Sequence, residues 1–183
     1  MKAGIITILF VLLWSLVTPN AFADEKASRS SATFAGLLST QQGDDRVVVL
    51  RKYLEQQHSP LAPLAEVFVS QADLYQLPWN MVAAMTGTES TFGQAVPINC
   101  NNPLGFGIYT NHMTCFPSYR EAIKTVSKSL REDYLNKWKA SDVYEIGHIY
   151  AASPTWGDHT SYFMNQIEAF KLQFESQSLP ISL

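Results

Sequence analysis

Residues 81–94 read MVAAMTGTESTFGQ, and this stretch decides the fold prediction. Its spacing predicts a helix over residues 78–89 or 78–90, because Pro78 suits a first helical turn and a glycine follows soon after the end. On a helical wheel, Val82 and Met85 lie within about 40° of Glu89. The glutamate therefore falls on the apolar face, at the helix end where backbone carbonyls already carry partial negative charge.

A carboxylate is an unexpected residue at this position. Partial burial and the C-terminal end of the helix both raise a carboxyl pKa. A glutamic acid that stays protonated near neutral pH is what a general acid requires. The alternative is a structural glutamate that pairs with Arg120 or caps the loop amides after Asn99.

Apolar residues at helical spacing predict further helices on both sides of this one. We expect one from Asp44 to just before Ser59, one over residues 63–74, one over 142–151 and a last one over 158–174. Another helix begins at the capping box Ser118–Glu121. One face of this helix carries large apolar residues that are predicted to be core: Ile123, Val126, Leu130, Tyr134 and Trp138. Phe170 of the last helix is also predicted to be core.

A short β segment is predicted after the third helix. Residues 96–103 contain two prolines and three asparagines, which is typical of a loop, and aromatic and β-branched residues over 104–116 indicate a small hairpin. The predicted fold class is therefore mainly α (α+β), a helical domain with a small inserted β-hairpin lobe.

The N-terminus has the pattern of an export signal. One cation, Lys2, precedes a short apolar run, and Ala21-Phe22-Ala23 matches a signal peptidase site, so we expect residues 1–23 to be a cleaved signal peptide. An uncleaved anchor is the alternative. Residues 24–43 are predicted to be a flexible leader, 44–176 the domain and 177–183 a C-terminal tail. The mature chain is then expected in the periplasm or secreted, without an integral membrane domain.

Charge and cysteine content narrow the function classes. Without Lys2 the chain has 12 basic and 16 acidic residues, a net charge of −4, which argues against nucleic-acid binding. Cys100 and Cys115 are the only cysteines, and in an exported protein we expect them to form a disulfide. The four histidines do not complete a metal site with them, so we expect neither metal nor cofactor.

Four stretches taken in order resemble a known family: MVAAMTGTESTFGQ, NNPLGFGIY, FPSYREAI and IYAASPTW. They are similar to the glucosaminidase (glycoside hydrolase family 73-type) branch of the lysozyme-like superfamily, which cuts peptidoglycan. The resemblance covers residues 62–170. It implies a cleft between a helical body and a small lobe, with Glu89 as the catalytic acid and Tyr150, near the scissile sugar, as a second catalytic residue that stabilises the charge or positions the nucleophile. It also implies that Asn102, Leu104 and Gly105 form the turn that frames the cleft.

Several residues near these motifs are candidates for sugar binding. Phe106, Tyr109 and Trp156 are predicted to stack on pyranose rings, with core packing as the alternative for each, and the turn at Asn102 and Gly105 is predicted to contact substrate. For Asn102 the alternative is turn chemistry alone. The partner is then the peptidoglycan glycan strand, and we expect the protein to act as a monomer.

The sequence lacks a second acid at a motif position. No aspartate or glutamate occurs between Glu89 and Glu121, and two-carboxylate glycosidases need a partner within about 5–9.5 Å. A single-acid mechanism assisted by the substrate's N-acetyl group is therefore predicted. Lytic transglycosylation of the same glycan, a non-catalytic wall-binding module and a scaffold in an envelope assembly are the alternatives.

Overall fold

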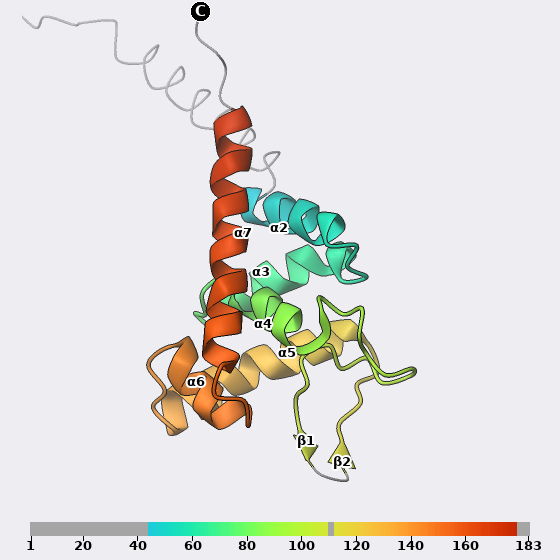
Figure 1. Ribbon diagram of the computed structural model, residues 1–183, viewed down its shortest axis with the longest axis vertical. Coiled ribbons are helices and arrows are strands. Elements are labelled where there is room, and N and C mark those ends of the chain that lie inside the picture. The colour runs from blue at the N-terminus through green and yellow to red at the C-terminus, as the bar shows by residue number, and fades with distance from the viewer. Residues whose placement is uncertain (1–43, 110–111, 179–183) are drawn as a thin grey trace, which may run out of the picture. The chain divides into compact units, whose positions relative to one another are not determined.

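The computed structural model describes residues 44–109 and 112–178 (Figure 1). The chain divides into two units, Met1–Gln42 and Gly43–Leu183, and all the described residues belong to the second. The predicted signal peptide, leader and most of the C-terminal tail lie outside the described residues.

The described part is mainly helical, which confirms the mainly α part of the predicted class. A short antiparallel ladder pairs Ile108 with Met113 and Tyr109 with His112. Each strand has only two residues, fewer than the 104–116 hairpin predicts. The elements in chain order are α2 (Asp45–Gln56), η1 (Ala62–Leu64), α3 (Ala65–Leu74), α4 (Met81–Ser90), β1 (Ile108–Tyr109), β2 (His112–Met113), α5 (Tyr119–Ser129), η2 (Leu130–Lys137), α6 (Val143–Tyr150) and α7 (Trp156–Ser178).

Three helices begin at side chains that satisfy free backbone amides. Asp44 accepts a hydrogen bond from the Arg46 amide at the start of α2, and Asp142 accepts two at the start of α6. Ser118 accepts a hydrogen bond of 3.3 Å from the Glu121 amide at the start of α5. Such caps are each worth about 1 kcal/mol. The serine half of the predicted capping box is therefore confirmed, while the Glu121 carboxylate accepts a hydrogen bond from Lys124.

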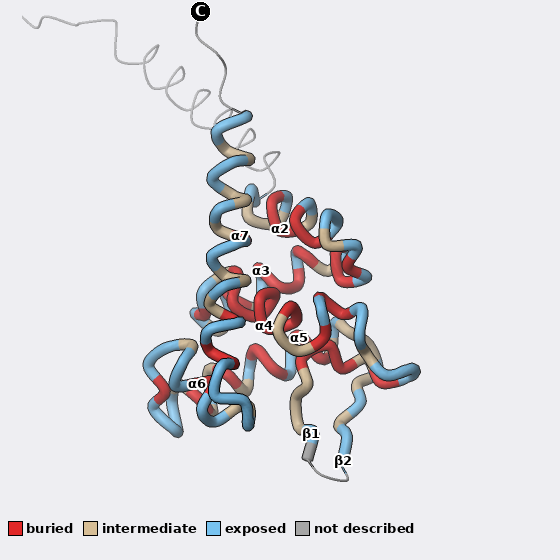
Figure 2. The backbone as a smooth tube through the Cα atoms, viewed as in Figure 1, coloured by how far each residue is buried: buried red, intermediate tan, exposed pale blue. Residues whose placement is uncertain are grey.

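Helix α4 is the centre of the core, and its apolar residues explain why. It packs against α3, α5 and α7, and Figure 2 shows it buried along most of its length. Every residue from Met81 to Gly87 is buried. A helix that is apolar all round must be covered all round, so the only side chains of α4 that reach partial exposure are at its end, Thr88 and Glu89.

The prediction of burial is wrong for Trp138. Ile123, Val126, Leu130 and Tyr134 are buried as expected, but Trp138 is 46% exposed. The reason is that the helix changes type at Leu130: η2 is a π-helix, in which the Trp138 amide donates to the carbonyl five residues back. The wider turn shifts each later residue around the axis, so a stripe drawn at the α-helical period misplaces the last one.

Helix boundaries also differ from the predicted ranges. The second predicted helix is split into η1 and α3. Helix α4 begins at Met81 because residues 78–80 form a turn closed by a bond from the Met81 amide to the Pro78 carbonyl. Helix α7 begins two residues early, at Trp156, and continues to Ser178. Within the described ranges, no helix combines the length and apolarity needed to cross a membrane.

Candidate functional site

Glu89 lies at the penultimate position of α4, where the chain makes an abrupt turn. The next residues, Thr91 and Phe92, both adopt left-handed backbone angles, with φ of 52° and 55°. Phe92 is buried and packs edge-on against Tyr53 and Phe163. The turn therefore ends the helix by burying a ring in the core, and this leaves the Glu89 side chain at the boundary between core and solvent.

Two distant segments meet the Glu89 carboxyl group. The indole nitrogen of Trp156, the first residue of α7, donates a hydrogen bond of 2.6 Å to Oε1. The other oxygen, Oε2, lies against Gly105, where an added Cβ would stand only 2.3 Å away. Gly105 has a φ of +63°. Glycine thus satisfies both the backbone angle and the close approach of the carboxyl group.

The electrostatic environment favours the protonated acid. Burial raises the pKa of Glu89 above its ordinary value, and the hydrogen bond from Trp156 partly offsets this by stabilising the charged form. Within residues 44–109 and 112–178, Glu89 belongs to no ion pair, and Arg120 is exposed. The alternative of a structural glutamate neutralised by Arg120 is therefore wrong.

Tyr150, the last residue of α6, is placed beside this pair. Its ring stacks on Trp156, with centroids 5.2 Å apart at 29°, and its hydroxyl donates a 2.7 Å hydrogen bond to the carbonyl oxygen of Leu104. Burial, then the charge on Glu89, then Tyr134 hold its pKa well above the usual value. Tyr150 is therefore a neutral hydrogen-bond donor that ties α6 to the residue preceding Gly105.

Ser90 is a site residue that the sequence reasoning missed. Its hydroxyl lies 2.6 Å from the carbonyl oxygen of Pro103 and accepts a 3.0 Å hydrogen bond from the Gly93 amide. It thus links the end of α4 to the chain immediately before Leu104. A buried serine directly after the glutamate of the quoted motif was the available signal.

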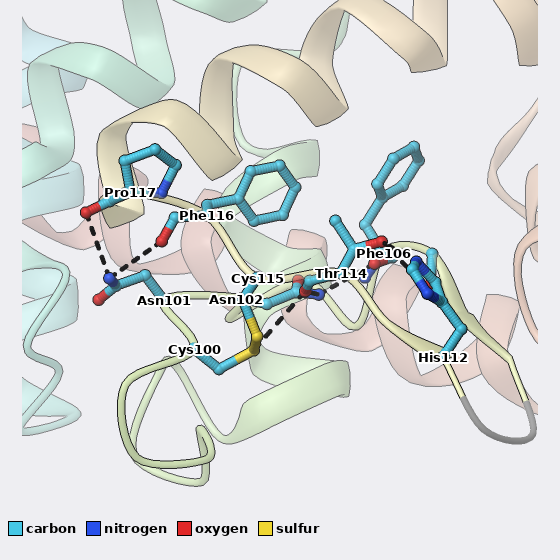
Figure 3. The surroundings of a disulfide bond; sticks show 10 residues. Cys100, Asn101, Asn102, Phe106, His112, Thr114, Cys115, Phe116 and Pro117 are labelled. Carbon is cyan, nitrogen blue, oxygen red and sulfur yellow. Dashed lines mark hydrogen bonds between the residues drawn. A yellow bond between two sulfur atoms is a disulfide. The ribbon is translucent and has the colours of Figure 1, made fainter.

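The segment from Asn99 to Pro117 is held together by asparagine side chains (Figure 3). Asn102 is buried; its amide nitrogen donates to the carbonyls of Phe106 and Thr114, and its oxygen accepts from the Phe106 amide. Both donors of Asn102 are thereby used within the segment. A hydrogen bond donated by Asn102 to substrate would require one of these two bonds to open.

The predicted disulfide is confirmed. Cys100 and Cys115 are bonded (Figure 3), and the Phe116 amide also donates to the Cys100 carbonyl. Asn101 reaches across to the Phe116 carbonyl oxygen at 3.1 Å. A covalent link of this span contributes about 3 kcal/mol by the chain-entropy estimate, and here it closes the base of the segment that presents Gly105.

The three aromatic candidates for sugar stacking lie in different surroundings. Trp156 is only 3% exposed, so its indole N–H reaches the site while its ring is covered. Phe106 is half-buried, 6.3 Å from the ring of Tyr150. The side chain of Tyr109 lies outside the described residues.

Comparison with known proteins adds no family assignment: no protein-family model and no curated protein matches the chain. Among the described residues, no group of three histidine, cysteine or acidic side chains is placed to hold a metal ion. What the structure brings together is a partly buried carboxyl group, one indole donor, a partly buried tyrosine and a glycine.

Proposed function

We propose that this chain is an exported peptidoglycan glycoside hydrolase that cleaves the glycan strand next to N-acetylglucosamine, with Glu89 as general acid. One observation supports the proposal above all others. A glutamic acid that is partly buried, unpaired by any cation of the described chain and shifted toward its neutral form stands at the boundary between core and solvent. These are the conditions under which a carboxylic acid can donate a proton near neutral pH.

The arrangement around Glu89 is compatible with a lysozyme-like cleft. In the proposed interpretation the helical body supplies α4, α6 and the start of α7, and the Asn99–Pro117 segment is the small lobe. Ser90 and Tyr150 each bond to a carbonyl of residues 103–104, so both hold that segment against the acid. The sequence resemblance to the glucosaminidase branch supports the same interpretation.

The proposed reaction needs one acid and one group of the substrate. Glu89 gives its proton to the glycosidic oxygen as the bond from that oxygen to C1 breaks, and the bonding electron pair stays with the departing hydroxyl. The carbonyl oxygen of the substrate's N-acetyl group bonds to C1 and takes up the positive charge. The bond between this oxygen and C1 closes a five-membered ring. Water then attacks C1, breaks that bond and returns a proton to the Glu89 carboxylate.

A digest of purified peptidoglycan by residues 24–183 tests the proposal, with Glu89→Gln as the control. Mass spectrometry before and after borohydride reduction identifies the new ends. Products with a reducible N-acetylglucosamine end that disappear in the control support the proposal. A Glu89→Gln variant that is as active as the wild type contradicts it.

Lytic transglycosylation is the second candidate. It is favoured by the lack of an acid between Glu89 and Glu121, because an internal 6-hydroxyl can take the place of water and needs no second carboxylate. Anhydro-muramyl ends, which borohydride does not reduce, are its signature in the same digest. Sedimentation with the wall but no soluble product would instead indicate a binding module.

A further inference from the structure

The two oxygens of the Glu89 carboxyl group lie in unequal surroundings. Oε1 accepts the hydrogen bond from the indole nitrogen of Trp156 at 2.6 Å. Oε2 lies on the opposite branch, against the backbone of Gly105. Over the described ranges, Oε2 takes part in no hydrogen bond.

The chemistry of indole decides where the acid proton can be. The indole N–H is a donor and has no acceptor lone pair. The carbonyl oxygen of a carboxylic acid is a stronger acceptor than its hydroxyl oxygen, and a proton on Oε1 that pointed at Nε1 would place two hydrogens in one short contact. The neutral acid therefore accepts from Trp156 through Oε1, as a carbonyl oxygen, and carries its own proton on Oε2.

The indole is held firmly enough to impose this choice. Trp156 is 3% exposed and stacks on Tyr150. On another side, a Cβ at Gly147 would come within 2.8 Å of its ring. Glycine at that position therefore lets α6 pack directly against the indole. A ring confined on these sides presents its N–H in one direction only.

We propose that Trp156 is the positioning residue of this site: it holds Oε1 and leaves Oε2, beside Gly105, as the oxygen that carries and delivers the proton. The inference rests on the proposed function, since it assigns a direction to the same proton transfer. The glycosidic oxygen must then approach Oε2 and not Oε1. After transfer, the hydrogen bond from Trp156 remains and strengthens, because its acceptor has become an anion.

Trp156→Phe tests the assignment, because it keeps an aromatic ring against Tyr150 and removes the N–H donor, together with part of the buried indole surface. Trp138→Phe is the matched control: it also removes an indole N–H, but at an exposed position after η2. The first measurement is an NMR pH titration of protein labelled at glutamate Cδ and indole nitrogen, with Glu89 assigned from Glu89→Gln. It needs no enzymatic activity.

In the wild type, the Trp156 indole signal is expected to titrate with the same midpoint as the Glu89 carboxyl, and the Trp138 signal is not. In folded Trp156→Phe the Glu89 midpoint moves upward by about one pH unit, because a donor to the charged form is gone. If the Trp156 indole signal does not change as Glu89 titrates, the wild-type measurement by itself overturns the inference. An unchanged Glu89 midpoint in folded Trp156→Phe overturns it as well.

The second measurement is the rate of peptidoglycan cleavage against pH. Trp156→Phe is expected to lower kcat by ~10- to 100-fold, because the proton donor is no longer fixed. The alkaline limb of its pH–rate profile is expected to move to higher pH. Trp138→Phe leaves both unchanged. If no variant and no wild type cleaves the wall, the proposed function fails while the titration still tests the contact. If the wild type cleaves the wall and Trp156→Phe has the same kcat and the same alkaline limb, the positioning role of Trp156 is contradicted while the proposed function stands.

Discussion

Gly105→Ala is the sharpest test of the contact between Glu89 and the Asn99–Pro117 segment. The new methyl carbon would stand 2.3 Å from Glu89 Oε2, whereas ordinary contact begins at 3.4 Å. The oxygen must therefore withdraw by about 1 Å. It is the free end of a flexible side chain, so the carboxyl group moves and the backbone stays. A misplacement of this size lowers a rate by about 100-fold.

The same substitution also has a cost unrelated to catalysis. Alanine at a φ of +63° destabilises the fold by about 1–2 kcal/mol relative to glycine, which lowers the Tm by about 3–10 °C. A fall in activity alone could then be a fall in the amount of folded protein. A control with the same backbone strain is needed.

Gly107 supplies that control. Its φ is +65°, and a Cβ there would stand 2.5 Å from the hydroxyl oxygen of Thr114. Gly107→Ala thus meets equal backbone strain and an equally close side-chain oxygen, without touching Glu89. Calorimetry should give similar losses of Tm for the two variants. Cleavage of purified peptidoglycan, normalised to folded protein, should fall about 100-fold only in Gly105→Ala. Equal rates in both variants would refute the placement of the acid at Gly105.

The Glu89 carboxyl group, the disulfide and the Tyr150 hydroxyl each give one further prediction. Because the pKa of Glu89 is raised in the folded state, the wild type loses stability as the pH rises through that folded pKa. Glu89→Gln should therefore unfold at a higher temperature than the wild type at neutral pH, and at the same temperature at a pH well below the carboxyl pKa of the unfolded chain. Calorimetry at the two pH values checks both expectations. Cys100→Ser with Cys115→Ser should lower the free energy of unfolding by about 3 kcal/mol, measured by urea titration and matched by reduced wild type. Tyr150→Phe should cost about 1–3 kcal/mol by leaving the Leu104 carbonyl without its donor; an unchanged urea midpoint would contradict that bond.

The helices and the acid were predictable because both depend on short-range pattern. Residues four apart on a helix share a face whatever surrounds it, so the position of Glu89 on the same face as the buried Met85 follows from spacing alone. The cap at Ser118 is equally local. Trp138 was misplaced because its orientation depends on a change of hydrogen bonding at Leu130, and no residue type marks such a change in a single sequence.

The partners of Glu89 were beyond sequence reasoning for a different reason. Trp156 is 67 residues away from its acceptor, and Tyr150 is 46 residues away from the Leu104 carbonyl. Spacing assigns a residue to a face of its own helix, but it does not say which helix end meets which. Trp156 was therefore predicted to stack on a sugar, whereas its burial and its hydrogen bond assign its N–H to the acid.

The site is assembled from the ends of elements, and this explains how a destabilising carboxyl group is kept. Glu89 is the penultimate residue of α4, Tyr150 ends α6 and Trp156 begins α7, while Gly105 lies in the loop before β1. Helix α7 packs against both α4 and α6, and the hydrogen bonds of Trp156 and Tyr150 fix the helix ends around Glu89. Burial of Glu89 opposes folding whenever the acid is ionised, and the hydrogen bond from Trp156 offsets only part of that. The desolvation cost that remains favours the protonated carboxyl group. A variant that removes this cost, such as Glu89→Gln, should gain stability and lose the proton donor.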